Sequence, residues 1–337
     1  MTSNTKLKPI EEQVVVVFGA SSGMGREAAI QFARRGAKVV VAARDAEGLS
    51  TLVASIGRVG GIAVSMVADT TDYDQVCAVA QKAVDEFGRL DTWVHTAGVS
   101  VYATLENTTP EEFKRVIDVN LLGQIYGAKA ALPHLRREGR GALIHVSSVE
   151  AYCALPYQSA YAASKHGVMG FLDSLRLELK KEGVAIAVTN VMPAGINTPL
   201  FSQARTKFGV KPMPVPPIYK PEHAAQILLH AAENPTRDIT VGGAAKFFIL
   251  GQRISPKLVD VFLLKTGFVG QKTGEVKDSA APDNLINPVA EHRVAGDFVQ
   301  KAKSFSSGVW LETHPRAQRA AKLALLGMAL MLLAKKR

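Results

Sequence analysis

The feature that most constrains the fold is a run of five apolar residues, Val14–Phe18, followed at once by a glycine-rich turn from Gly19 to Gly25. A continuous apolar run of this length predicts a strand that is buried on both faces, as in a parallel sheet. The residues after the turn have a helical pattern that ends at Arg35 and Gly36. This strand–turn–helix unit predicts an α/β fold in which backbone N–H groups at the start of the helix can bind a phosphate group.

The alternation of short apolar runs with helical patterns continues to about residue 240, as in a parallel sheet whose strands are joined by crossover helices. Strands are predicted at Val14–Phe18, Lys38–Ala42, Ile62–Val67, Thr92–His95, Ala142–Val146, Ala185–Val191 and Ile239–Val241. Helices are predicted near 46–57, 73–87, 110–137, 159–182 and 221–233, the third of them with a capping box formed by Thr109 and Glu112. We therefore expect one α/β domain over residues 1–244 and a C-terminal extension over residues 245–337.

Two later segments break this alternation. Residues 199–220 contain several prolines, which exclude a regular helix, and a loop of this length in a compact domain is more often functional than idle. The extension contains an amphipathic segment at 246–265, a polar linker near 269–297 and a terminal helix that is both basic and apolar. We therefore expect the extension to add helices to the sheet domain.

The composition limits the class of protein. Of the 337 residues, 47% are hydrophobic, which is enough for a large core and argues against bulk disorder. Cys77 and Cys153 lie far apart, so they predict neither a disulfide framework nor a zinc site, and we expect no metal. The N-terminal residues are polar and lack the apolar core of a signal peptide, which indicates a cytoplasmic protein.

The net charge of +10 is concentrated at the C-terminus. Residues 301–337 contain eight Lys and Arg side chains against one acid, and this segment accounts for +7 of the total. The rest of the chain is nearly balanced in charge. This distribution argues against nucleic acid as a partner.

The apolar run Leu323–Ala334 lies between basic residues, and its twelve residues are fewer than the roughly 20 that a membrane span needs. Such a helix can lie in the headgroup region of an anionic membrane, so we predict a peripheral membrane contact through the tail. The segment 246–265, in which Phe247 and Phe248 lie beside Lys246, can add a second contact. The alternative is that both helices pack on the body of the protein or on a partner subunit.

Tyr161 and Lys165 are four residues apart in a predicted helix, so their side chains share one face. A tyrosine titrates near pH 10, and a neighbouring ammonium group favours the phenolate and lowers that pKa. Ser148 lies thirteen residues before Tyr161, and its hydroxyl can bind the oxygen with which the tyrosine exchanges a proton. With the glycine-rich turn as a phosphate site, these residues predict hydride transfer. For the pair alone, the alternative is a half-buried aromatic residue beside a solvated lysine.

The set of motifs consists of the GASSGMG turn, Asp69, the run Thr96-Ala97-Gly98, Asn120, Ser148, Tyr161, Lys165 and the segment from Pro193 to Thr198. This set resembles the short-chain dehydrogenase/reductase family, in its single-domain branch, over about residues 12–243. The resemblance implies a Rossmann-type doubly wound sheet of seven parallel strands flanked by helices, a nicotinamide cofactor, and a homodimer or homotetramer. In such a turn Gly19 permits the tight bend, Gly23 lets the backbone approach the pyrophosphate, and Gly25 packs the helix against the strand.

The resemblance also implies the roles of individual residues, and its catalytic set is Asn120, Ser148, Tyr161 and Lys165. Tyr161 is the general acid/base, and Lys165 lowers its pKa and binds the nicotinamide ribose. Ser148 orients the carbonyl or alcohol, and Asn120 holds a helix kink and a water of the proton relay. Asp69 is expected to contact the adenine amino group, and Thr198 the nicotinamide carboxamide. The cofactor-binding set is Gly19, Ser21, Ser22, Gly23, Met24, Gly25, Arg44, Asp69, Thr70, Ala97, Gly98, Tyr161, Lys165, Pro193, Gly195, Ile196 and Thr198.

Arg44 predicts which nicotinamide cofactor is used. It follows the second strand directly, at a place where an NAD-preferring site has an acid that binds the ribose 2′-hydroxyl. An acid would repel a 2′-phosphate, whereas a guanidinium can pair with it. We therefore predict that NADP(H) is preferred over NAD(H), the alternative being that Arg44 is a surface residue.

The sequence departs from the family pattern at three places. Phe18 stands where a threonine or small residue is usual, His95-Thr96 replaces Asn-Asn, and Ala194 replaces the glycine that usually follows the proline. None of the four predicted catalytic residues is affected. We interpret His95, like His145 and His166, as structural rather than as an acid/base group.

The expected function is that of an NADP(H)-dependent oxidoreductase that interconverts an alcohol and a ketone or aldehyde. Apolar residues near the predicted site, Tyr152, Cys153, Leu155 and Pro156, favour a lipophilic substrate. Glu150 is either a polar anchor for the substrate or a solvent-facing loop acid. Two alternatives stay open, an epimerase or dehydratase on the same fold and a cofactor-binding scaffold or sensor without turnover.

Overall fold

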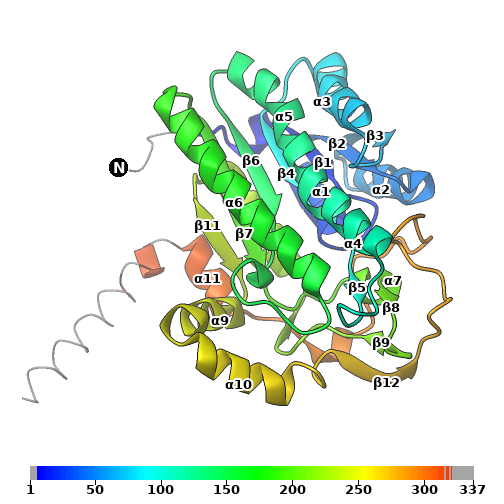
Figure 1. The fold of residues 1–337 in the computed structure, drawn as a ribbon. Helices are drawn as coiled ribbons and strands as arrows, with labels where there is room; N and C mark the ends of the chain where they lie inside the picture. Colours follow the sequence, from blue (N-terminus) through cyan, green and yellow to red (C-terminus); the bar gives the residue numbers. More distant parts are fainter. Residues whose placement is uncertain (1–5, 315, 319, 321–337) are drawn as a thin grey trace, which may run out of the picture.

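A computed structural model of the chain describes residues 6–314, 316–318 and 320 (Figure 1). Its centre is a parallel sheet of seven strands in the order β11-β7-β6-β4-β1-β2-β3. The strands are β1 (Val14–Phe18), β2 (Lys38–Ala43), β3 (Ile62–Val67), β4 (Thr92–His95), β6 (Gly141–Val146), β7 (Ile186–Pro193) and β11 (Asp238–Val241). The predicted Rossmann-type sheet is confirmed, and the strand order reverses at β1, between β4 and β2.

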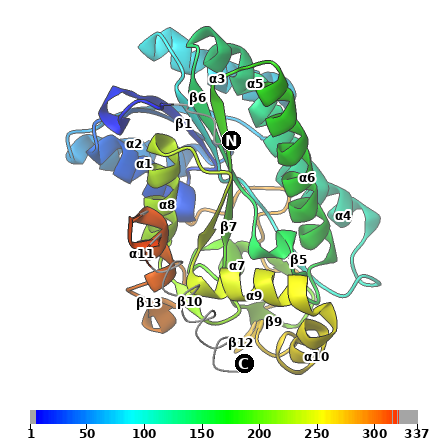
Figure 2. The ribbon, with the colours of Figure 1, turned by 90° about the vertical axis from the view of Figure 1, so that its left-hand side faces the viewer.

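Helices cover both faces of the sheet, as Figure 2 shows. One layer consists of α1 (Gly23–Arg34), α2 (Ala46–Arg58) and α8 (Pro221–Glu233), with α11 (Ser307–Thr313) beside α8. The other layer consists of α3 (Tyr73–Phe87), α5 (Gly123–Arg137) and α6 (Ser159–Lys181). The side chains of β1 alternate between the two cores, since Val15 and Val17 pack in the first and Val16 and Phe18 in the second. This explains why its sequence is apolar throughout.

The single helix predicted near 110–137 is interrupted. It consists of α4 (Pro110–Ile117), a π-helical turn over Asp118–Leu122 and then α5. The predicted capping box at the start of α4 is present, because the Thr109 hydroxyl accepts from the Glu112 N–H and the Glu112 carboxylate accepts from the Thr109 N–H. The π-helical turn contains the buried Asn120, and such turns are frequent at functional sites.

The proline-containing segment 199–220 has no long helix. It contains α7 (Leu200–Gln203) and three short strands, β8 (Arg205–Thr206), β9 (Val210–Pro212) and β10 (Ile218–Tyr219). Each strand pairs with a segment distant in the sequence: β8 with β5 (Val101–Tyr102), β9 with β12 (Lys272–Val276) and β10 with β13 (Ala302–Lys303). The partners β12 and β13 belong to the extension. Since β12 lies within the predicted linker near 269–297, that linker is in part a strand.

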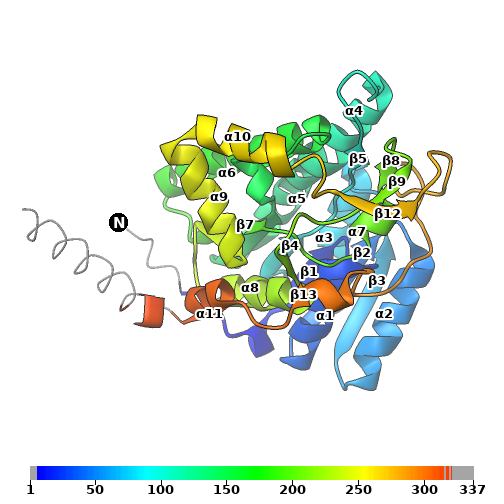
Figure 3. The same ribbon diagram turned by 90° about the horizontal axis from the view of Figure 1, so that it is seen from below.

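The amphipathic segment predicted at 246–265 is a pair of helices, α9 (Gly243–Ile254) and α10 (Pro256–Thr266). The break follows from Pro256, which lacks the N–H that a continuous helix would need, and Ser255 before it leaves the helical conformation, with φ −151° and ψ 87°. Figure 3 shows α9, α10, β12 and β13 running across one end of the molecule. The division at residue 244 stays a prediction. Buried residues of the extension, such as Leu285 and Val309, join clusters that also contain residues of the sheet domain.

The segment Leu323–Ala334, for which a membrane contact is predicted, lies outside the described residues. Within the part of the chain that the structure describes, no helix combines the length and apolar character that crossing a membrane requires.

Candidate active site

One cavity at the carboxyl ends of the central strands brings the predicted site residues together. It reaches from the turn after β1, past the ends of β2 and β3, to the start of α6 and the loop after β7. All of the predicted cofactor-binding residues line it, as do the predicted catalytic residues Ser148, Tyr161 and Lys165. Asn120 is fully buried and does not line the cavity. Parallel strands of a doubly wound sheet bind ligands at this edge, next to the point where the strand order reverses.

The glycine-rich turn forms a cradle that side chains would fill. A Cβ atom at Gly19, whose φ is +89°, would lie 2.4 Å from the backbone nitrogen of Ala97. A Cβ atom at Gly25 would lie 2.3 Å from the carbonyl oxygen of Gly19. Both contacts are with backbone, so neither can be relieved by a rotamer change. The turn leads into α1, whose first N–H groups have no partner within the helix, and this arrangement fits an anionic pyrophosphate.

Tyr161 and Lys165 occupy the first turns of α6 and are brought to the cavity with Ser148. The Lys165 ammonium lies 5.3 Å from the centre of the Tyr161 ring and donates to the carbonyl of Val146, 3.0 Å away. Ser148 caps a short 3-10 helix, where its Oγ accepts from the Glu150 N–H at 3.1 Å. The hydroxyl, the phenol and the ammonium therefore come from two segments that meet at the end of β6.

The side chain of Asn120 makes hydrogen bonds to neighbouring segments and does not line the cavity. Its side-chain amide donates to the carbonyl of Val99 at 2.9 Å and to Ser164 Oγ at 3.2 Å, and its Oδ1 accepts from the Val99 N–H at 2.8 Å. Asn120 thus joins the loop after β4 to the helix that carries Tyr161 and Lys165. The π-helical turn orients this side chain, which a regular helix over 110–137 would place elsewhere.

The electrostatics around Tyr161 differ from the expectation that Lys165 lowers its pKa. Burial raises the pKa of Tyr161 above its ordinary value, the carboxyl of Glu150 raises it further, and the Ser148 side chain acts in the opposite direction. Burial also lowers the pKa of Lys165 to about 8, against the effect of Glu150. The expected lowering is absent in the protein alone, because burial disfavours the phenolate more than its surroundings favour it.

Glu150 is a buried member of this site, although the sequence left a solvent-facing loop acid as an equal alternative. Its side chain lines the cavity, it is only 4% exposed, and the described contacts of its carboxylate include one long hydrogen bond, from the Leu155 N–H at 3.4 Å. Burial raises the pKa of Glu150 to about 8. The sequence contained no signal for this burial, which depends on how the loop folds over the end of β6.

We expect a stability change that depends on pH when Glu150 is replaced by glutamine. The folded protein holds the Glu150 proton between pH 4.5 and about 8, whereas the unfolded chain releases it, so wild-type stability falls as the pH rises through this window. Glutamine does not titrate, so Glu150→Gln removes this loss of stability at higher pH. Its stability relative to wild type should rise from pH 5 to pH 8 by an amount on the order of a few kcal/mol.

Thermal unfolding of both proteins across this pH range measures the effect. Glu106→Gln is the matched control, because Glu106 is exposed. A constant difference in melting temperature between wild type and Glu150→Gln from pH 5 to pH 8 would contradict the buried, protonated carboxyl.

At the far end of the cavity lie Arg44 and Asp69, the residues predicted to contact the adenosine half of the cofactor. Arg44 is half-buried and donates to the carbonyl oxygens of Ile286 and Asn284 at 2.5 and 2.6 Å. Asp69 accepts from Arg115 at 2.9 Å and from both the N–H and the hydroxyl of Thr71. Burial alone would raise the pKa of Asp69, but the contacts with Arg115 and Thr71 hold it below its usual value. Part of the cavity wall is thus formed by Asn284, Pro288 and Val289 of the extension, which the sequence did not associate with this site.

The departures from the family pattern at Phe18 and His95 have one structural explanation. The rings of Phe18 and His95 stack at 5.3 Å, and those of His95 and His145 stack at 6.0 Å. Burial lowers the pKa of His145 to about 3 and that of His95 well below its usual range, so both rings are neutral. The three side chains fill the core beneath the site, in agreement with the structural role expected for the two histidines.

Comparison with known proteins identifies the family. The family described as short chain dehydrogenase matches residues 13–208, more than half of the chain. The chain belongs to the short-chain dehydrogenase family. It is 38% identical over 268 residues to the uncharacterized oxidoreductase YxnA of Bacillus subtilis, covering 79% of this chain and 75% of that protein. It is 32% identical over 234 residues to the 3-oxoacyl-[acyl-carrier-protein] reductase FabG of Thermotoga maritima, covering 68% of this chain and 94% of that one.

A solved structure agrees with the family assignment. The crystal structure of a short-chain dehydrogenase from Mycobacterium paratuberculosis bound to NAD superimposes with a TM-score of 0.62 and 27% identity, covering 69% of this chain and 97% of that one. This short-chain dehydrogenase is therefore an oxidoreductase with the family's Rossmann-type sheet. The family match ends at residue 208, so it includes none of the extension.

Proposed function

We propose that the protein is an NADP(H)-dependent oxidoreductase that interconverts an alcohol and a ketone or aldehyde, with Tyr161 as general acid/base. The observation that carries the proposal is the single cavity that joins Tyr161, Lys165 and Ser148 to the glycine-rich turn and Arg44. The proposed reaction needs the substrate and the dinucleotide side by side, and this cavity reaches both Tyr161 and the glycine-rich turn. The test is consumption of NADPH by the purified full-length protein in the presence of a panel of lipophilic ketones.

Each residue of the site has a part in the proposed reaction. When bound, the nicotinamide supplies or accepts the hydride. Tyr161 exchanges a proton with the substrate oxygen, and the Ser148 hydroxyl donates a hydrogen bond to that oxygen. Lys165, held by the Val146 carbonyl, binds the nicotinamide ribose and favours the phenolate. Asn120 positions Val99 and Ser164 beside them.

The cofactor is proposed to lie along the cavity with its pyrophosphate at the start of α1. Gly23 lets the backbone approach it, while Gly19 permits the tight bend and Gly25 packs the helix against the strand, in agreement with the close Cβ positions at Gly19 and Gly25. At the adenosine end Asp69 contacts the adenine amino group and Arg44 the ribose 2′-phosphate. A guanidinium has five N–H donors, and the two that Arg44 gives to carbonyl groups leave others for a phosphate. At the other end Thr198 contacts the nicotinamide carboxamide.

The substrate is proposed to be lipophilic. Near Tyr161 the cavity is lined by apolar side chains, among them Cys153, Leu155, Phe201, Met213 and Phe248. The relative from Thermotoga maritima is a reductase of 3-oxoacyl groups, which are carbonyl compounds, and this supports reduction of a carbonyl group here. An epimerase or dehydratase would use the same cofactor without net consumption, and a scaffold or sensor would bind it without turnover, so the same assay separates these alternatives.

The protein is further proposed to act as a homodimer or homotetramer in the cytoplasm, with a peripheral membrane contact. The pair of helices α9 and α10 supports the membrane contact. Large apolar side chains on it are exposed, including Phe247 (74%), Ile254 (73%) and Leu258 (70%). On α9 the exposed Phe247, Leu250 and Ile254 lie three and four residues apart, and on α10 Val261 and Phe262 lie three and four residues after Leu258, so each set shares a face. The pair of helices also carries Lys246, Arg253, Lys257 and Lys265. An apolar face with surrounding cations suits an anionic lipid surface.

We expect the full-length protein to float with anionic liposomes, and a triple change of Phe247, Ile254 and Leu258 to serine to reduce the floated fraction several-fold. A chain truncated after residue 315 tests the contribution of the C-terminal tail in the same assay. Leu177→Ser is the matched control, because Leu177 is exposed to a similar extent (67%) on α6. If wild type stays with the soluble fraction, and the triple change instead alters the oligomeric state, the face binds a second copy of the chain and the membrane contact is wrong.

A further inference from the structure

Residues 284–297 of the extension cross the cavity at its adenosine end, and we call this segment the strap. It contains no helix or strand, and its residues Asn284, Pro288 and Val289 line the same cavity as the glycine-rich turn. The family match does not include the strap.

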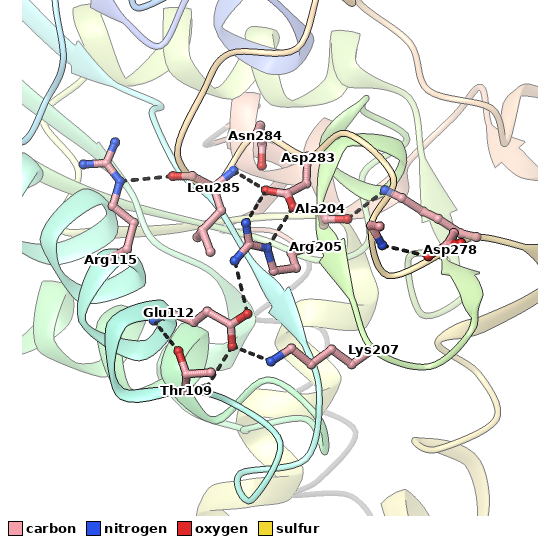
Figure 4. Close-up of polar contacts among 12 residues, drawn as sticks. Thr109, Glu112, Arg115, Ala204, Arg205, Lys207, Asp278, Asp283, Asn284 and Leu285 are labelled. Carbon is pink, nitrogen blue, oxygen red and sulfur yellow. Dashed lines mark hydrogen bonds and ion pairs between the residues drawn. The ribbon is translucent and has the colours of Figure 1, made fainter.

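The strap is anchored firmly where it begins, as Figure 4 shows. Asp283, the residue before it, accepts from Arg205 at 2.8 Å, and Arg205 also contacts Glu112 at 3.2 Å. Lys207 lies 2.7 Å from the same Glu112, so the anchor is a network of two acids and two bases. The next residues enter the core: the side chain of Leu285 is fully buried, and its carbonyl accepts from Arg115 at 3.0 Å.

The strap is anchored again where it ends. The N–H of Gly296 donates to the carbonyl of Asn197 at 3.1 Å, and the N–H of Phe298 donates to the Asn197 side chain at 3.0 Å. A Cβ atom at Gly296 would lie 2.5 Å from the carbonyl oxygen of Thr198, so only glycine allows this approach. The segment between the two anchors spans the cavity from the Arg44 side to the loop after β7.

Between its anchors the strap contacts the groups that the proposed function assigns to the phosphates of the cofactor. Arg44 donates to the carbonyl groups of Asn284 and Ile286, as described above. The N–H of Gly23, at the start of α1, donates to the carbonyl of Arg293 at 3.0 Å. His292 Nε2 lies 2.8 Å from a carboxylate oxygen of Asp45, the residue after Arg44. The middle of the strap is thus held by the same edge of the sheet at which the dinucleotide is proposed to bind.

We infer that the strap is the outer wall of the dinucleotide site and has to open for the cofactor to enter and leave. The inference rests on the proposed function, because it concerns the same site. A segment fixed at both ends over the pyrophosphate and adenosine positions encloses a ligand beneath it. Its middle is held by a few polar contacts, with Asp45 and His292 as a pair outside the proposed catalytic and cofactor-binding sets, and these contacts break when the strap opens.

The experiment measures dissociation of NADPH from the full-length protein by stopped-flow fluorescence after mixing with excess NADP. In His292→Ala the 2.8 Å contact with Asp45 is lost, and we expect the dissociation rate to rise about five- to tenfold, the size of effect expected from losing one polar contact. NADH should also dissociate faster from His292→Ala than from wild type, by a similar factor, since the strap encloses both cofactors. His314→Ala is the matched control in the extension, because His314 is exposed and lies outside the strap. It should release NADPH at the wild-type rate.

Two further measurements report on the strap directly. Combining Asp45→Ala with His292→Ala should raise the dissociation rate no further than Asp45→Ala alone, because the contact with His292 is already lost in that variant. Amide hydrogen exchange of residues 284–297 should slow when NADPH binds.

If NADPH binds but the dissociation rate in His292→Ala and the hydrogen exchange of the strap are unchanged, the strap does not enclose the cofactor. If His292→Ala instead slows dissociation, the strap competes with the cofactor and the inference is again overturned. If wild type binds neither cofactor, the failure is that of the proposed function.

Discussion

Replacing Tyr161 by phenylalanine should reduce turnover by about 10²–10⁴-fold or more, the usual contribution of general acid/base catalysis, while NADPH still binds. Phenylalanine keeps the ring that packs at the start of α6 and removes only the hydroxyl that exchanges the proton. Steady-state consumption of NADPH with an active ketone measures the first effect. Fluorescence titration with NADPH measures the second.

The matched control for this change is Tyr126→Phe, because Tyr126 lies on α5 and does not line the cavity. It should have wild-type activity. The pH dependence adds a second readout: burial raises the pKa of Tyr161 and keeps the phenol neutral, so the hydroxyl is ready to donate a proton to a carbonyl at neutral pH. Near-wild-type activity in Tyr161→Phe would rule out the proposed acid/base.

Replacing Arg44 by alanine should weaken NADPH binding about 10- to 100-fold, which corresponds to the loss of about 1.5–3 kcal/mol for hydrogen bonds to a charged group. NADH has no 2′-phosphate, so its affinity should fall much less. Isothermal titration with both cofactors gives the ratio of the two affinities, which isolates the phosphate contact. An equal fall in affinity for both cofactors would instead indicate that the change acts through the contacts of Arg44 with the carbonyl groups of Asn284 and Ile286.

Arg58→Ala is the control for the removal of a positive charge, because Arg58 is exposed on α2. It should leave the ratio of affinities unchanged. A wild-type protein that prefers NADH, with a ratio that Arg44→Ala does not alter, would contradict the proposed specificity. In that case the role of Arg44 would be to hold the carbonyl groups of Asn284 and Ile286.

The features that could be predicted from the sequence are those with local causes. The seven strands and the helix starts follow from the period of apolar residues and from capping residues such as Thr109 and Glu112. In the turn after β1, Gly19 and Gly23 have positive φ, a local backbone geometry that favours glycine, and the sequence therefore marks the turn directly. The shared face of Tyr161 and Lys165 follows from helical spacing alone.

Only the tertiary structure decided the features that depend on contacts between distant segments. The pKa of Glu150 is raised because the loop after β6 buries it, and no local pattern distinguishes it from an exposed loop acid. The pKa of Tyr161 rises although its lysine neighbour is present, because burial is a property of the whole site. The polar segment 284–297 has the composition of a linker, yet it crosses the cavity because Arg44, Arg115 and Arg205, far away in the sequence, bind its backbone and the acid before it. Spacing within a chain determines helices, strands and turns, whereas burial and long-range hydrogen bonds exist only once the chain has folded.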